Sequence, residues 1–383
     1  MYFGDHVKIL HITPQCPDNN SGGSIGVLQT ALSLSEKSNT IDYVGPEFRN
    51  REYLGLYSKV FELDKEKSIF RRFLYLFKGI INSRYSSWLH LEIDYTAYDV
   101  IILEFTKQAY ILEKIPKEKL FLRVHNVEYD YAKKVYRHKR NIVNYLTYIF
   151  SKRSEHQLLK NAYKVLALTS NDMNRLIELY GNTISDLNRK IRLLPVCVKG
   201  GKQISVFGEN RLKMLITGSL WYGENYKGIK WLITNVLPKL NISYLLTIAG
   251  SNPNNELVKL VSNDPNIILI SSPLDTKDLF LESELYLAPV FDGAGMKVKI
   301  AEALSFGLPV VGTKHAFIGY DVSNNINSYV ANSVIEYVRA ILDYNSLDNE
   351  EKLNFSNNVI KLFKDKYEIS QSAKIWTTVI KGE

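Results

Sequence analysis

A glycine-rich segment in the last third of the chain has the composition of an anion-binding turn. The segment reads Gly293, Ala294, Gly295, Met296 and Lys297. It follows an apolar run ending at Pro289, and an amphipathic stretch begins directly after it. Small residues let backbone N–H groups approach an anion, and a helix N-terminus adds unpaired donors and a favourable dipole. We predict a phosphate-binding turn in which Lys297 supplies a positive charge; the alternative is an ordinary glycine turn with a solvated lysine.

Glu302 lies about a turn and a half beyond Lys297 on the helix expected here. Its carboxylate can accept hydrogen bonds from the two hydroxyls of a ribose. Lys299, between the two, is a further candidate for binding the same ligand. The alternative for Glu302 is a surface glutamate without a ligand.

Two blocks of sequence resemble the donor site of family 4 glycosyltransferases, which have the GT-B fold. The first is residues 293–303 followed by 307–313. The second runs from Thr217 through Ser219, Asn225 and Lys227 to Pro238 and resembles the first strand, loop and helix of the family's nucleotide-sugar domain. By this resemblance Lys227 matches a diphosphate-binding lysine, and Ser219 and Asn225 belong to the donor site. The likeness is strong over about residues 211–320 and weaker before them.

Two positions depart from the family pattern. Family members commonly have a glutamate eight residues before the one that matches Glu302, and Ala294 stands there. A basic residue often follows the glycine of the first loop, and Ser219 stands there. Contacts to the sugar would then come from backbone amides of residues 293–296 or from Asp292. No Asp-x-Asp metal motif is present, which favours neutralisation of the diphosphate by lysines and helix dipoles over a bound metal.

The first half of the chain offers two smaller signals. Gly22 and Gly23 lie between an expected strand at 7–12 and an expected helix at 27–35, where the family has a glycine-rich loop. His125 follows the expected strand 120–124, at the edge where doubly wound sheets bind ligands, and the family often has a histidine here that contacts the donor sugar. A plain strand-to-helix turn and a structural histidine are the respective alternatives.

The elements that must position these residues follow one pattern throughout the chain. Short aliphatic and β-branched runs alternate with longer amphipathic ones, which is typical of parallel sheets covered by helices. The expected strands are 7–12, 41–44, 100–104, 120–124, 165–169 and 191–198, and then 213–217, 244–249, 267–270, 285–288 and 309–312. The sequence thus predicts an α/β protein with two doubly wound, Rossmann-like domains, which in the GT-B fold face a central cleft.

A break at residues 199–202, with Gly200 and Gly201, divides the two series of strands. We therefore expect an N-terminal acceptor-binding domain at 1–200 and a C-terminal donor-binding domain at 201–364. A helix over about 365–383, with apolar residues at helical spacing, is expected to close the chain and to pack back on the first domain.

The composition is that of a globular protein, with 45% hydrophobic and 23% charged residues and a net charge of +8. Residues 1–200 hold 30 basic and 21 acidic residues, a surplus of +9, whereas the rest of the chain sums to −1. No nucleic-acid-binding motif accompanies this charge. Cys16 and Cys197 form no metal or disulfide spacing. With no signal peptide or spanning segment recognised, we expect a cytoplasmic protein, with peripheral attachment to the inner face of the membrane as a further expectation.

Two basic, aromatic stretches account for part of this surplus. In the first, Phe70, Phe73, Leu74, Phe77, Ile80 and Ile81 share a helical face beside Arg71 and Arg72. The second contains Lys133, Lys134, Arg137, Lys139 and Arg140. Apolar insertion combined with attraction to anionic lipid would make them a membrane and acceptor face. The alternatives are a core-packed helix and a solvated one.

These observations predict a glycosyltransferase with no cofactor, and the resemblance to the family implies that it is retaining and metal-independent. It would move a hexose-type sugar from a nucleotide diphosphate donor, with a UDP-sugar as the first expectation, to a glycan or lipid-linked glycan of a cell-surface polysaccharide such as capsule or O-antigen. His125, Lys297 and Glu302 are the expected catalytic residues. Two alternatives stay open: a silent glycosyltransferase-like partner subunit, motivated by Ala294 and Ser219, and a dinucleotide-dependent oxidoreductase, weakened because no Gly-x-Gly-x-x-Gly follows the first strand.

Overall fold

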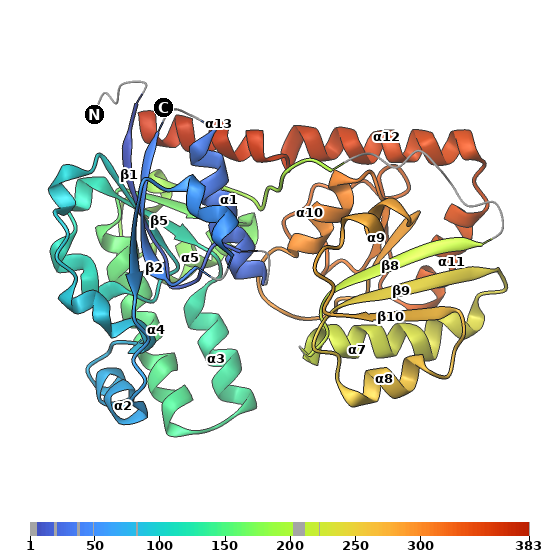
Figure 1. Cartoon of the computed structure of the whole chain (residues 1–383), viewed down its shortest axis with the longest axis horizontal. Coiled ribbons are helices and arrows are strands. Elements are labelled where there is room, and N and C mark those ends of the chain that lie inside the picture. Colours follow the sequence, from blue (N-terminus) through green and yellow to red (C-terminus); the bar gives the residue numbers. More distant parts are fainter. Residues whose placement is uncertain are drawn as a thin grey trace. The chain divides into compact units, whose positions relative to one another are not determined.

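The computed structural model describes residues 6–18, 21–36, 39–48, 50–81, 83–201, 211–221 and 223–382 (Figure 1). It divides into two compact units. The first comprises Met1–Val196 together with Ser372–Glu383, and the second comprises Cys197–Gln371. Of the break expected at 199–202, Lys202 lies outside the described residues.

The first unit is built on a seven-stranded sheet in the order β3-β2-β1-β4-β5-β6-β7, whose described ladders are all parallel. The strands are β1 (Lys8–Ile12), β2 (Thr40–Pro46), β3 (Lys59–Leu63), β4 (Val100–Glu104), β5 (Leu120–Val124), β6 (Lys164–Ala167) and β7 (Ile191–Leu193). The chain reverses its direction of winding between β1 and β4. In doubly wound sheets that switch point is where ligands bind.

Helices cover both faces of this sheet because alternate residues of each strand point to opposite sides. Ile9, Ile102 and Phe121 lie in a core with residues of α1 and α13, in which Trp376 is fully buried. Leu10, Leu103 and Leu122 lie in a second core with residues of α4 and α5. The helices are α1 (Gly22–Ser35), α2 (Ile69–Phe77), α3 (Glu128–His138), α4 (Ile142–Asn161), α5 (Ser170–Tyr180), α6 (Leu187–Lys190) and α13 (Ile369–Lys381).

The second unit repeats the plan with a six-stranded sheet in the order β10-β9-β8-β11-β12-β13, again parallel in its described ladders. The strands are β8 (Leu212–Ser219), β9 (Tyr244–Ser251), β10 (Ile267–Ser271), β11 (Leu285–Ala288), β12 (Val310–Gly312) and β13 (Ser328–Val330). The helices are α7 (Gly223–Trp231), α8 (Asn255–Val261), α9 (Lys277–Leu281), α10 (Val298–Ser305), α11 (Val334–Asn345) and α12 (Asn349–Lys366). The winding reverses between β8 and β11.

The predicted class, two doubly wound α/β domains, is confirmed, and most predicted strands match within one or two residues. Strands β3 and β13 were missed because each is short or mixed in polarity. Strand β7 ends at Leu193, well before the predicted residue 198. The closing helix begins at Ile369 instead of 365, because α12 runs through Lys366 and the chain turns at Tyr367 and Glu368.

The N-terminus of α1 also differs from the prediction. The helix begins at Gly22, so Gly22 and Gly23 form its first turn instead of a loop before it. Ser21 is the N-cap, and its side chain accepts a hydrogen bond from Ser24 N at 3.2 Å. This cap offsets the low helix propensity of the two glycines.

Within the described ranges, none of the helices combines the length and the apolar character that a membrane crossing requires.

Candidate active site

The predicted anion-binding turn follows β11 at the switch point of the second sheet. Gly293 and Gly295 have φ values of +115° and +68°, in the left-handed region that favours glycine. The His315 ring donates from Nε2 to the carbonyl oxygen of Gly293 at 2.8 Å. Gly293 N donates to Asp292 Oδ1 at 2.6 Å, so this amide already has an acceptor within the turn. The turn therefore has a defined shape, which its glycines and His315 hold.

Lys297 is the N-cap residue of α10, and its side chain folds back over the turn. Its Nζ donates to the carbonyl oxygens of Ala294, at 3.1 Å, and Gly295, at 2.9 Å. The buried Tyr320 hydroxyl donates to Lys297 O at 2.9 Å and accepts from Ala301 N at 3.1 Å, which fixes the start of α10. The structure thus places the Lys297 ammonium directly at the glycine turn.

Close packing brings the second sequence block against this turn. A Cβ atom on Gly228 of α7 would lie 1.8 Å from the carbonyl oxygen of Pro289, so only glycine permits this approach. The Trp231 ring meets the Phe291 ring at 4.8 Å between centroids. Asn225 Nδ2 donates to Ser219 O at 3.0 Å and so ties α7 to the loop after β8. Two blocks separated by about sixty residues of sequence therefore form one surface.

The remaining donor-site candidates lie around this surface. Lys227 projects from α7 with 73% of its side chain exposed, and its nearest carboxylate is Glu224 at 3.6 Å. Glu302 of α10 is largely buried, and its Oε2 lies 2.7 Å from Lys299 Nζ, one turn earlier on the same helix. Ala294 is exposed and Met296 is buried beneath the turn.

In the first unit, His125 joins a buried polar network at the carboxyl end of β1, β4 and β5. Its Nε2 lies 2.5 Å from Glu104 Oε2. The other carboxylate oxygen, Oε1, accepts from Thr30 Oγ1 at 2.5 Å and from His11 Nε2 at 3.1 Å. Arg123 Nη1 lies 4.0 Å from Oε1. Glu104, His11 and Arg123 are completely buried.

The electrostatics of this network favour an ionised glutamate beside a neutral histidine. Burial by itself raises the pKa of Glu104, but the electrostatic interaction with His125, the charge of Arg123 and the hydrogen bonds from His11 and His125 outweigh it and hold that pKa well below its usual range. Burial lowers the pKa of His125 despite the neighbouring carboxylate. At neutral pH, Glu104 is therefore an acceptor of hydrogen bonds, and the His125 ring is uncharged.

Residues 211–345, which contain both sequence blocks and the turn, match the family model for glycosyl transferases group 1. This region is a group 1 glycosyltransferase domain. The whole chain is 23% identical over 398 residues to an uncharacterized 44.6 kDa protein in the cps region of Klebsiella pneumoniae, covering 98% of this chain and 99% of that protein.

Solved structures extend the likeness to the whole fold. The sucrose-phosphate synthase of Thermosynechococcus elongatus aligns with a TM-score of 0.71 and 13% identity, over 98% of each chain. WaaG, a glycosyltransferase involved in lipopolysaccharide biosynthesis, aligns with a TM-score of 0.69 and 13% identity, over 98% of this chain and 100% of that one. Anabaena HepE, solved with UDP and glucose, aligns with a TM-score of 0.65 and 12% identity, over 99% of this chain and 100% of that one. The chain therefore has the GT-B fold, as predicted.

The two glycines predicted to approach the reaction centre lie in the first turn of α1, as described above. Gly23 faces Gln15, since a Cβ there would lie 2.3 Å from Gln15 Oε1. The glycine that contacts His125 is instead Gly26, where a Cβ would lie 2.6 Å from the ring Cε1. The glycine in contact with His125 therefore lies about one turn further along α1 than the two predicted glycines.

The first basic stretch lies on α2, and the second lies on α3 and continues past its end at Lys139 and Arg140; both helices contact α4 (Figure 1). The apolar face of α2 is not buried in the core, because Ile69 is 79% and Phe70 is 69% exposed. The helix ends at Phe77, so Ile80 and Ile81 do not continue its face. Ile142, Val143 and Ile149 of α4 are exposed as well. Of the six residues predicted to share this face, Phe70, Leu74 and Phe77 are exposed, so core packing does not account for half of the face.

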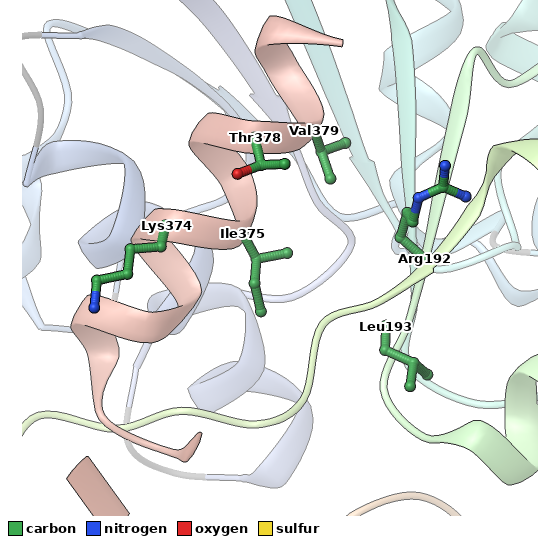
Figure 2. Close-up of a pocket in the computed structure, with 6 residues that line it drawn as sticks. All are labelled: Arg192, Leu193, Lys374, Ile375, Thr378 and Val379. Atoms are coloured by element: carbon green, nitrogen blue, oxygen red, sulfur yellow. The ribbon is translucent and has the colours of Figure 1, made fainter. Parts of the chain in front are cut away.

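The first unit also has a pocket of about 230 Å³ between β7 and α13 (Figure 2). Figure 2 shows the apolar side chains of Leu193 and Ile375 on its two sides, while the charged ends of Arg192 and Lys374 point away. This pocket contains none of the predicted site residues. In the part of the chain that the structure describes, no cluster of three or more His, Cys, Asp or Glu side chains could hold a metal ion.

Among the residues of these sites that were not identified from the sequence are His315, Glu104, His11 and Arg123. Glu104, His11 and Arg123 could have been identified from the sequence, because each is a polar residue within an otherwise apolar run that is expected to form a strand of a parallel sheet. Such residues are buried on folding and must find partners. His315 lies in a loop, and no pattern in the sequence indicates its contact with Gly293.

Proposed function

We propose that this protein is a retaining glycosyltransferase that takes a sugar from a nucleotide diphosphate donor, with a UDP-sugar as the first candidate. The observation that carries the proposal is the surface formed by the 289–297 turn, α7 and the start of α10 within the group 1 glycosyltransferase domain. It combines a glycine turn, a helix N-terminus and a cation, which together suit a diphosphate.

In this proposal Lys297 and the first amides of α10 stabilise the departing diphosphate, on which negative charge grows as the glycosidic bond breaks. Lys227 assists from α7, and Glu302 binds the ribose. Lysines would thus replace a metal ion at the diphosphate. Ala294 leaves the sugar hydroxyls to backbone groups of the turn, because no acidic side chain occupies that position.

The Glu302→Ala variant tests the ribose contact. We expect nucleotide diphosphate binding to weaken by about 1–3 kcal/mol, because the two ribose hydroxyls lose a buried acceptor. Isothermal titration of the purified chain with UDP and GDP measures the effect. Glu350→Ala, in the exposed first turn of α12, is the matched control and should bind like the parent. Unchanged affinity in a folded Glu302→Ala protein would remove Glu302 from the site.

The acceptor is proposed to be a glycan or lipid-linked glycan of a cell-surface polysaccharide. The relative in the cps region of Klebsiella pneumoniae and the fold shared with WaaG support this class. Hydrolysis of the donor by the purified chain in the absence of acceptor would distinguish an active enzyme from a silent partner subunit.

The first unit is further proposed to attach to an anionic membrane surface through the α2–α4 face. Helices α2 and α4 carry exposed apolar residues and contact each other, α2 also carries Arg71 and Arg72, and the basic helix α3 contacts α4. Monomeric proteins rarely expose such patches without a partner. Apolar insertion and attraction to acidic lipid together give reversible attachment.

Replacing Lys133, Lys134, Arg137, Lys139 and Arg140 with glutamine should weaken this attachment, since each basic residue near the surface contributes about 1 kcal/mol at modest salt. Flotation with vesicles containing phosphatidylglycerol measures it. The parent should bind these vesicles, bind phosphatidylcholine vesicles poorly, and dissociate as added salt screens the charges. The variant should keep its turnover on a short soluble acceptor.

The matched control removes the same number of charges from exposed lysines of the second unit: Lys239, Lys259, Lys277, Lys361 and Lys364. It should still float with acidic vesicles. If the parent shows no dependence on acidic lipid, the basic helix serves an anionic glycan acceptor instead, and the α3 variant should then fail on that acceptor in solution.

A further inference from the structure

The buried Glu104 carboxylate accepts hydrogen bonds at both of its oxygens. Three donors point at its two oxygens, Thr30 and His11 at Oε1 and His125 at Oε2. Arg123, whose guanidinium also donates to Gly26 O at 2.7 Å and to Gln29 Oε1 at 2.8 Å, balances the charge. Three elements, β1, α1 and β5, thus meet at this one side chain of β4.

This arrangement decides which nitrogen of His125 carries the proton. An ionised carboxylate only accepts hydrogen bonds, so the Nε2 atom that lies 2.5 Å from Glu104 must be the protonated one. In a neutral ring the other nitrogen, Nδ1, then has a free lone pair. Among the described residues, no group of the protein is within hydrogen-bond distance of Nδ1.

The ring itself is fixed from both sides. The Phe105 ring stacks on it with centroids 3.9 Å apart and an interplanar angle of 13°. Gly26 lies against the imidazole, where a Cβ would be 3.0 Å from Nδ1. Phe105 reaches its place with φ of +68°, a conformation that costs energy for a bulky residue and is found preferentially at functional sites. Both the orientation and the proton position of His125 are therefore set in advance.

We propose that Glu104 is a positioning residue that holds His125 as the neutral, Nε2-protonated tautomer, so that Nδ1 accepts a hydrogen bond from a substrate hydroxyl. This inference rests on the proposed function. It makes His125 an acceptor that recognises a sugar hydroxyl and disfavours an anionic group at the same place, because a lone pair repels a carboxylate or phosphate oxygen.

Glu104→Gln is a sharp test because it should reverse this proton arrangement. The Oε1 position receives two donors, from Thr30 and His11, so the carbonyl oxygen of the glutamine must take it. Its amide NH₂ then faces His125 and donates to Nε2, which must give up its proton. The neutral ring can only carry that proton on Nδ1, where it becomes a donor instead of an acceptor.

Long-range ¹H–¹⁵N correlation spectra of the histidine rings read the tautomer directly, with His125→Gln to assign the signal among the seven histidines. The parent should show Nε2 protonated and Nδ1 unprotonated at pH 7, and Glu104→Gln should show the reverse. Its kcat should fall about 10- to 100-fold, the range seen when the residues that orient metal-bound imidazoles are removed. The Kd for UDP should be unchanged, because the nucleotide is assigned to the second unit.

Asp42→Asn is the matched control. Asp42 is another buried carboxylate of the same sheet, and the Tyr98 hydroxyl donates to it at 2.8 Å, at an oxygen that asparagine can also supply. This variant should keep both the His125 tautomer and the parental kcat. Thermal unfolding of both variants shows whether lost turnover reflects lost folding.

A parent spectrum with Nδ1 protonated, or with a doubly protonated ring at pH 7, would overturn the proposal, and this measurement does not depend on any variant that must fold. So would a folded Glu104→Gln protein with reversed protons and parental kcat. Failure of the proposed function would instead appear as absent UDP binding and absent donor hydrolysis in the parent, whatever the tautomer of His125.

Discussion

Alanine in place of Lys297 is expected to lower kcat about 10²- to 10³-fold, the range for removing one preorganised group that faces charge developing in the transition state. The Nζ atom lies on the turn itself, bonded to the carbonyl oxygens of Ala294 and Gly295. It needs only to exchange these acceptors for a diphosphate oxygen. Because negative charge on that oxygen increases as the sugar leaves, the lysine contributes more to the transition state than to the bound donor.

Steady-state kinetics with a varied donor test this expectation. The donor KM of Lys297→Ala should rise by a smaller factor than kcat falls. Lys227→Ala should also lower kcat more than it raises the donor KM, but by smaller factors, because the Lys227 side chain is 73% exposed and its charge is screened by water. Lys230→Ala, on the same helix and exposed, is the control and should behave like the parent. A rise in KM with unchanged kcat would mean that Lys297 merely holds the donor.

Gly228→Ala is expected to destabilise the second unit strongly, although alanine in a helix normally stabilises it by about 1 kcal/mol relative to glycine. The added methyl would lie 1.8 Å from the carbonyl oxygen of Pro289, a backbone atom that no side-chain rotation can move away. Helix α7 must therefore separate from the end of β11. Overpacking of this kind costs typically about 1–3 kcal/mol and more where backbone has to shift.

Thermal unfolding together with UDP titration measures both consequences. The melting temperature should fall, and UDP affinity should fall with it, because Lys227 and Asn225 move with α7. Gly223→Ala is the matched control in the same helix, where an added Cβ meets nothing within 4 Å, and it should be neutral or slightly stabilising. If Gly228→Ala melts like the parent and binds UDP normally, the close contact between α7 and the turn is wrong.

Much of the fold could be predicted because the signal was local. Runs such as Val100–Glu104 and Leu285–Ala288 are apolar and bounded by polar segments, and the structure has both strands at these residues. The glycines at 293 and 295 indicated a tight turn by their residue type alone, and both have positive φ. The exposure of the apolar face of α2 was harder to predict, because the sequence of an amphipathic helix does not show what covers its apolar side.

Which residues share a face of a strand follows from the sequence alone. In an extended strand side chains alternate, so His11 must point with Ile9, Glu104 with Ile102, and Arg123 with Phe121. The glycine turn and the helix that follows it are equally local. All of these depend on a few neighbouring residues, because backbone sterics and side-chain alternation act over short distances.

That these polar residues meet depends on the tertiary structure. Strands β1, β4 and β5 become neighbours through the order β3-β2-β1-β4-β5-β6-β7, although nearly ninety residues separate β1 from β4. Local pattern does not fix this order, because each strand could pair with any other of similar apolarity; it follows from how the crossover helices bury both faces of the sheet. Gly26 of α1 then packs against His125 beside Glu104, and Gly228 of α7 packs against the carbonyl oxygen of Pro289, through contacts between segments that the sequence keeps apart.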